Sequence, residues 1–72
     1  EHRLTVQFPE QWLRLVPADL QQGLIQVLEQ DPRPAYQHDP ERVYGFPFAR
    51  LEIRFVVAGD ILTVCGVFPA EP

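Results

Sequence analysis

The feature that most constrains this chain of 72 residues is the alternating stretch near its C-terminal end. Apolar residues occupy every second position from Leu51 to Val57, and mostly charged residues stand between them. This period of two predicts a half-buried β-strand. The pair Gly59-Asp60 that follows has glycine first, as a type II′ turn requires, and it predicts a hairpin whose return strand covers residues 61–68.

The hairpin turn also predicts which residues share a face. One face is expected to be apolar and to contact the helices, with Leu51, Ile53, Phe55 and Val57 opposite Phe68, Gly66, Val64 and Leu62. The other face carries Val56, Thr63, Cys65 and Val67 beside Glu52 and Arg54. This second face is more apolar than a solvated surface, so we expect a neighbouring domain or subunit to cover it.

Three further elements precede the hairpin. An alternation of apolar and polar residues predicts a strand at residues 4–8. Pro9 and Pro17 each suit the start of a helix, and they predict helices over residues 9–15 and 17–30. The apolar residues expected to face inward are Trp12 and Leu15 in the first helix, and Leu20, Leu24, Val27 and Leu28 in the second.

Together these elements predict an α+β fold. We expect a small antiparallel sheet of about three strands, formed by the N-terminal strand and the C-terminal hairpin, with two helices packed on one face. Gly23 lowers the helix propensity of the second helix, and we expect it to mark a close contact with the sheet. Residues 1–72 are expected to be a single domain with a thin core, cut from a larger protein.

Composition limits the environment and the partners of the chain. No stretch approaches the roughly 18 consecutive apolar residues of a membrane span, and no signal peptide is recognisable. The single Cys65 is expected to be a small buried thiol in a reducing compartment, which favours the cytoplasm. The formal net charge is −4, but residues 32–54 carry four of the six arginines and have a net charge of +1.

The chain carries little chemistry of its own. The four glycines are too scattered to form a phosphate-binding loop. His2 and His38 have no second ligand at a usable spacing, so no metal site is expected. Cys65 has no neighbouring histidine and no helix start that would lower its pKa, so no catalytic residue is expected in the chain.

The most informative candidate site is the connection from Asp31 to the hairpin. The segment at residues 31–36, DPRPAY, holds Arg33 between two prolines that stiffen the backbone and keep it extended. Two outcomes remain open for Arg33, contact with an external anion or a pair with Asp31. The tyrosines Tyr36 and Tyr44 are interpreted either as core residues with a wet hydroxyl or as stacking platforms for a base. The pair Asp39-Pro40 is interpreted as an ordinary turn. With Arg42 nearby, the combination favours recognition of an unstacked nucleotide.

The DPRPAY segment, the ERVYG segment at residues 41–45 and the following hairpin together resemble a known family. The chain is similar to the C-terminal domain of the TrmO-type (YaeB) tRNA adenine N6-methyltransferases over most of residues 20–67. The resemblance implies a homodimeric enzyme whose N-terminal β-barrel domain binds S-adenosylmethionine, with no cofactor site in the present chain. It implies methylation of N6 of threonylcarbamoyladenosine beside the anticodon, with the isolated domain inactive.

The resemblance also suggests site residues and partners. By resemblance, Asp31, Arg33 and Tyr36 would face the active site or the tRNA, and Tyr44 matches a second signature of the family. We add Arg42 as a candidate tRNA contact on its charge and position. A second hypothesis is kept beside this one, in which the domain stabilises or dimerises its parent enzyme without touching RNA. The two differ on whether Arg33 and Tyr36 line a shared open surface.

Overall fold

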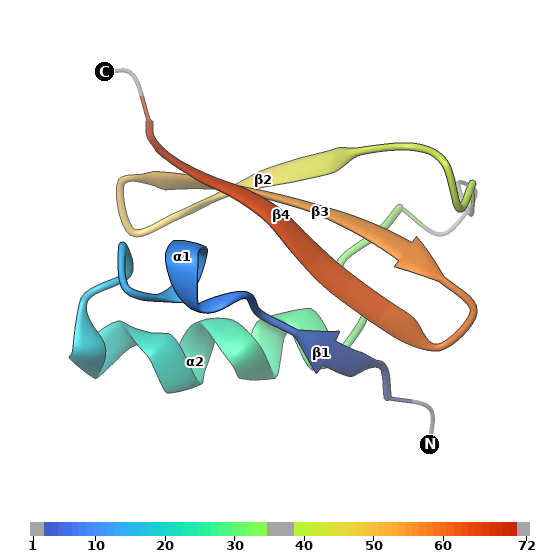
Figure 1. Cartoon of the computed structure of the whole chain (residues 1–72), viewed down its shortest axis with the longest axis horizontal. Coiled ribbons are helices and arrows are strands. Elements are labelled where there is room, and N and C mark those ends of the chain that lie inside the picture. The colour runs from blue at the N-terminus through green and yellow to red at the C-terminus, as the bar shows by residue number, and fades with distance from the viewer. Residues whose placement is uncertain (1–2, 35–38, 71–72) are drawn as a thin grey trace.

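The structure, a computed structural model, describes residues 3–34 and 39–70. The described residues form six elements, with two helices and four strands in one sheet (Figure 1). In chain order the elements are β1 (Thr5–Gln7), α1 (Glu10–Leu13), α2 (Ala18–Glu29), β2 (Tyr44–Phe48), β3 (Leu51–Ala58) and β4 (Ile61–Pro69). The predicted α+β class is confirmed.

The sheet differs from the prediction in two respects. Its order is β1-β4-β3-β2, so the hairpin occupies the centre and has a further strand on each side rather than on one side only. The additional strand β2 pairs antiparallel with β3 and forms one edge of the sheet. β1 pairs parallel with β4, which makes the sheet mixed rather than antiparallel.

The hairpin of β3 and β4 begins with the predicted register and then departs from it. Gly59 has a φ of 62° in the turn, and Val57 and Phe55 pair with Leu62 and Val64 as predicted. Beyond that point β4 contains one extra residue, Cys65, which forms a β-bulge.

The bulge reverses the faces of the residues that follow it in β4. Val67 turns into the core, where it pairs with Ile53 and is only 3% exposed. Phe68 turns outward and is 40% exposed, and Gly66 pairs with Arg54 rather than with Ile53. The prediction that placed Val67 on the outer face, and Gly66 and Phe68 on the inner face, is therefore wrong. Cys65 is exposed rather than buried.

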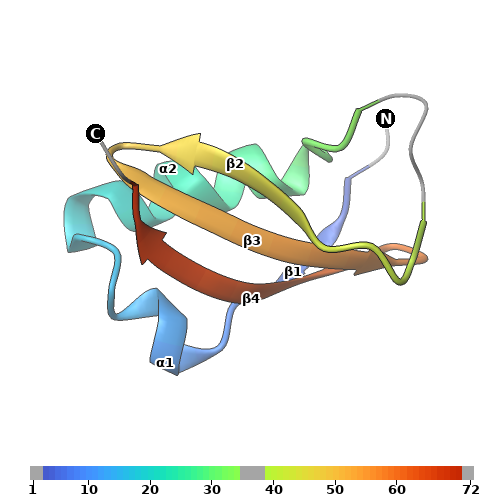
Figure 2. The same cartoon turned by 90° about the horizontal axis from the view of Figure 1, so that it is seen from above.

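Helix α2 covers one face of the sheet (Figure 2). It begins after Pro17 and ends before Gln30, close to the predicted limits. Leu24 and Leu28 are fully buried in the same core as the inward-facing residues of β3 and β4. Two further predictions for this helix are wrong. Val27 does not face inward, because it is 39% exposed. Gly23 does not mark a close contact with the sheet, because a Cβ atom added there would meet nothing within 4 Å.

Helix α1 is shorter than predicted and lies beside β4. Its Trp12 is half-buried as expected, but Leu15 is exposed, and Val16 enters the core in its place. The side-chain amide of Gln21 on α2 donates to the carbonyl oxygens of Leu13 and Val16, at 3.1 and 3.0 Å. These bonds join α2 to the end of α1 and to the segment that follows it, and the Leu13 carbonyl oxygen also accepts from the Val16 N–H at 3.0 Å.

The outer face of the sheet carries an aromatic contact of its own. The ring of Phe68 lies 6.0 Å from that of Trp12, and the Arg54 guanidinium lies over it at 5.1 Å. A Cβ atom on Gly66 would lie 2.5 Å from the Phe68 ring, so only glycine allows this close approach.

A strained turn joins β2 to β3. Phe48 and Leu51 form the last pair, and the two residues between them, Ala49 and Arg50, have φ values of 50° and 68°. Positive φ at both positions is the geometry of a type I′ turn, for which Asn-Gly is strongly preferred. Each non-glycine residue in this region costs roughly 1 kcal/mol relative to glycine. The C-terminal end of β4 is tied to the turn, because the Ala70 N–H donates to the Arg50 carbonyl at 2.9 Å.

Candidate functional site

The candidate site lies where α2 ends and the chain crosses to β2. Asp31 directly follows Gln30, the residue that caps α2 at its C-terminal end, and it has a φ of 62°. Aspartate adopts this conformation more readily than most residues. Its N–H still donates to the Leu28 carbonyl at 3.1 Å. Pro32 comes next and cannot continue the helix, so the chain leaves α2 in one defined direction.

Asp31 and Arg33 form a two-pronged ion pair. The Arg33 Nε and Nη2 groups donate to the two carboxylate oxygens of Asp31, each at 2.7 Å. The Arg33 backbone N–H also donates to Oδ1 at 3.3 Å. The Arg33 side chain is only 9% exposed and that of Asp31 24% exposed. Hydrogen bonding to Asp31 raises the pKa of Arg33 above its usual value, so the guanidinium stays charged at all ordinary pH values.

Tyr44, the first residue of β2, belongs to the core. Its side chain is 6% exposed, and its ring stacks on Phe55 with 5.5 Å between ring centroids and 22° between planes. The Tyr44 hydroxyl oxygen accepts a hydrogen bond from the Asp39 N–H at 3.1 Å. The phenol therefore anchors the chain that returns from the loop to the sheet.

Arg42 lies on the exposed side of this anchor. Its guanidinium stands over the Tyr44 ring, 5.7 Å from the centroid, and the residue is exposed. Asp39 shapes the turn before it, because its carboxylate accepts from the Glu41 N–H at 2.9 Å and its carbonyl accepts from the Arg42 N–H at 3.1 Å. This arrangement is the turn that the Asp39-Pro40 pair predicted.

The structure thus brings four of the five predicted site residues to one end of the domain. Asp31 holds Arg33, and Arg42 lies over Tyr44. The fifth, Tyr36, lies outside the described residues, as do His2 and His38. The arrangement offers one partly buried arginine that is bound by Asp31 and one exposed arginine that can contact an anion.

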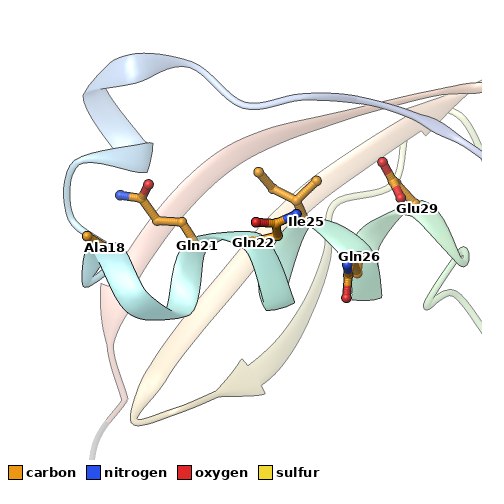
Figure 3. A pocket seen from close by; sticks show the side chains of 6 residues that line it. All are labelled: Ala18, Gln21, Gln22, Ile25, Gln26 and Glu29. Atoms are coloured by element: carbon orange, nitrogen blue, oxygen red, sulfur yellow. The ribbon is translucent and has the colours of Figure 1, made fainter.

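Two hollows are lined entirely by described residues, and neither has the features of a cofactor site. An open groove of about 390 Å³ runs along α2 and is lined by Ala18, Gln21, Gln22, Ile25, Gln26 and Glu29 (Figure 3). All its side chains come from one helix, whose backbone groups bond within the helix, and none is aromatic. A second hollow of about 230 Å³ beside β2 is smaller than the roughly 300–1,000 Å³ of typical cofactor sites. Neither fits S-adenosylmethionine.

Residues 3–34 and 39–70 contain no candidate metal site. No group of three or more His, Cys, Asp or Glu side chains in these ranges is arranged to bind a metal ion. Within the same residues, neither helix is long and apolar enough to cross a lipid bilayer.

A comparison with known protein families covers nearly the whole chain. The family model of the TrmO C-terminal domain matches residues 1–70, which include every element described above. The chain belongs to the TrmO C-terminal domain family. It is accordingly a domain associated with tRNA methyltransferases. No curated protein and no solved structure gives a significant match.

One structural role in this TrmO C-terminal domain could not be assigned from the sequence. Asp39 was interpreted only as a turn residue, but its N–H also binds the Tyr44 hydroxyl across the loop. A five-residue separation between a backbone donor and a buried phenol leaves no recognisable pattern in sequence.

Proposed function

We propose that this chain is the tRNA-positioning domain of a larger, cytoplasmic, S-adenosylmethionine-dependent methyltransferase. In this proposal the enzyme methylates N6 of threonylcarbamoyladenosine beside the anticodon, as a homodimer. The cofactor is bound by an N-terminal barrel domain, and the present domain alone is inactive. The observation that carries the proposal is the match to the TrmO family together with the exposed Arg42, which follows the DPRPAY segment in sequence.

The residues of the loop take different parts in this proposal. Arg42 contacts a phosphate of the anticodon arm, because its guanidinium is exposed and held in place by the Tyr44 ring. Tyr36 stacks on an unstacked base. Asp31 and Arg33 orient the segment that carries Tyr36, since two of the five Arg33 donors are already used within the pair.

A second candidate function rests on the burial of Arg33. A side chain that is 9% exposed and bound on two atoms by Asp31 is suited to holding a loop together. In this alternative the domain stabilises or dimerises the parent enzyme and does not touch RNA.

Methylation kinetics of the full-length enzyme separate the two candidates. Arg42→Ala should lower kcat/KM for tRNA roughly 10- to 100-fold, because the reacting adenosine loses its position. Tyr36→Ala should act in the same direction. The matched control is Arg14→Ala, which removes another exposed arginine and should leave the kinetics unchanged.

Affinity for S-adenosylmethionine should stay at the wild-type value in all three variants, because their side chains lie outside the proposed cofactor domain. Wild-type kinetics in folded Arg42→Ala and Tyr36→Ala enzymes would exclude tRNA positioning and favour the structural role.

A further inference from the structure

The six arginines divide into two groups of equal size. Arg3, Arg33 and Arg54 each form an ion pair, with Glu29, Asp31 and Glu52 respectively. Arg14, Arg42 and Arg50 have no carboxylate partner among the described residues, and all three are exposed. The arginines of the second group are therefore the ones whose charge remains available to a partner.

Two of these three arginines lie at the ends of the same edge strand. Arg42 precedes β2 by two residues and Arg50 follows it by two, and β2 has a hydrogen-bonded neighbour on one side only. The segment before β2 and the β2–β3 turn stand at opposite ends of the sheet (Figure 1). At a rise of about 3.3 Å per residue, the eight steps from Arg42 to Arg50 separate the two residues by at most roughly 26 Å. Arg14 lies elsewhere, after α1, which contacts β4 on the other side of β3.

The turn that carries Arg50 is not explained by the packing of the domain. Ala49 and Arg50 both have positive φ, which glycine would adopt at lower cost. Both residues are exposed, and the Arg50 side chain has no ion-pair partner in the described residues, so it adds no charge contact that stabilises the fold. The two-residue hairpin requires positive φ at these positions but does not require these side chains, and backbone strain kept in this way clusters at functional positions.

The charge around Arg50 also favours an anionic partner. The nearest carboxylate in sequence is Glu52, which is bound to Arg54 at 3.1 Å and so does not neutralise Arg50. The short turn fixes the backbone on which the guanidinium stands, and a guanidinium matches the geometry of a phosphate.

We propose that Arg50 is a second phosphate-contacting residue, and that the backbone of the RNA follows the free edge of β2 from Arg42 to Arg50. This rests on the proposed function and extends it from the loop to a whole edge of the sheet. The contact is to the sugar-phosphate backbone, so it positions the RNA without reading its sequence.

Binding measurements on the full-length protein test this assignment. The probe is a tRNA that carries threonylcarbamoyladenosine beside the anticodon, titrated at several salt concentrations between about 50 and 200 mM, the range in which phosphate contacts govern affinity. Arg50→Gly should weaken binding about 3- to 10-fold and reduce the slope of log K against log salt by about one. Hydrogen exchange of the backbone amides of β2 and β3 should be no faster than in the wild type, because glycine reduces the backbone strain in the turn.

Two control variants isolate the charge at this position. Ala49→Gly relieves the same turn and keeps the arginine, and Arg14→Ala removes a charge away from β2; neither should change affinity or salt slope. An unchanged affinity in Arg50→Gly, while Arg42→Ala weakens binding, overturns the β2-edge assignment alone. An equal loss of tRNA affinity in Arg14→Ala also overturns the β2-edge assignment, because the effect of an arginine would then not depend on its position. Absence of tRNA binding by the wild-type protein overturns the proposed function itself.

Discussion

The ion pair between Asp31 and Arg33 gives the most quantitative prediction. The domain contains a second pair of the same type and the same spacing, Glu52 and Arg54, in which the Arg54 Nε donates at 3.1 Å. The two pairs differ in burial. The side chains of Arg54 and Glu52 are 49% and 42% exposed, whereas those of Arg33 and Asp31 are 9% and 24% exposed. The two pairs also differ in geometry, because Arg33 donates from two atoms and Arg54 from one, so their comparison tests burial and two-pronged bonding together.

The expected energies follow from the bonds and the exposure. The Asp31–Arg33 pair has two charge-assisted hydrogen bonds of 2.7 Å, and hydrogen bonds to charged groups contribute about 1.5–3 kcal/mol each after the lost hydration is counted. Since Asp31 retains part of its solvent contact, we expect a net coupling free energy of about 2 kcal/mol. The exposed Glu52–Arg54 pair should couple by about 0.5 kcal/mol or less.

Two double-mutant cycles measure these couplings. The first uses Asp31→Asn and Arg33→Gln, because asparagine keeps the tolerance for positive φ that alanine would lose. The second uses Glu52→Gln and Arg54→Gln. Urea unfolding followed by the fluorescence of the single Trp12 gives each free energy of unfolding. Equal coupling in the two pairs, or loss of the Asp31–Arg33 coupling in about 1 M salt, would refute the view that burial makes this pair a fixed part of the loop.

Two further predictions concern stability. Gly23→Ala should raise the free energy of unfolding by about 0.5–1 kcal/mol, because a Cβ atom there meets nothing within 4 Å. A lower free energy of unfolding, measured by urea denaturation, would mean that α2 is packed more closely at this point. Val67→Asp should unfold the domain, since it places an unpaired carboxylate in the core, while Thr63→Asp on the half-buried outer face should leave circular dichroism and cooperative unfolding intact. A folded Val67→Asp domain would contradict the register after the bulge.

The elements that the sequence predicted correctly are those set by local patterns. The helical spacing of Leu20, Leu24 and Leu28 places α2 within one residue of its observed limits. Gly59-Asp60 predicts the hairpin turn and the pairing of Val57 and Phe55 beyond it. In each case the deciding interaction lies within a few positions along the chain, where periodicity and turn preferences act.

The errors arose where tertiary contacts decide. β2 was missed because Gly45 and Pro47 disfavour a strand, and an edge position tolerates both. The bulge at Cys65 leaves no alternation to detect, since Val64, Val67 and Cys65 itself are all apolar. One inserted residue then exchanges the inner and outer faces, which moves Val67 into the core and Phe68 out of it.

The candidate site shows the same division. The turn at Asp39 could be predicted from local geometry. The stiff, extended DPRPAY segment stays a prediction, because residues 35 and 36 lie outside the described part of the chain. The choice between an external anion and Asp31 as the partner of Arg33 could not, because it depends on the positive φ of Asp31, which aims the carboxylate back at the guanidinium. The stacking of Tyr44 on Phe55 likewise required the pairing of β2 with β3.

The distribution of charge reconciles an acidic domain with an RNA partner. The net charge of −4 would repel a polyanion if it were spread evenly, but two of the three arginines that have no carboxylate partner among the described residues stand at the two ends of β2. Acidic residues Glu10 and Asp19 stand in the first turns of α1 and α2, where they stabilise the helix dipoles. In the proposed complex, two phosphate contacts in an acidic setting would supply direction rather than much affinity, and the rest of the parent enzyme would supply most of the binding free energy for tRNA. The domain would then contribute the placement of the substrate, which affects kcat/KM more strongly than it affects the affinity of the isolated domain.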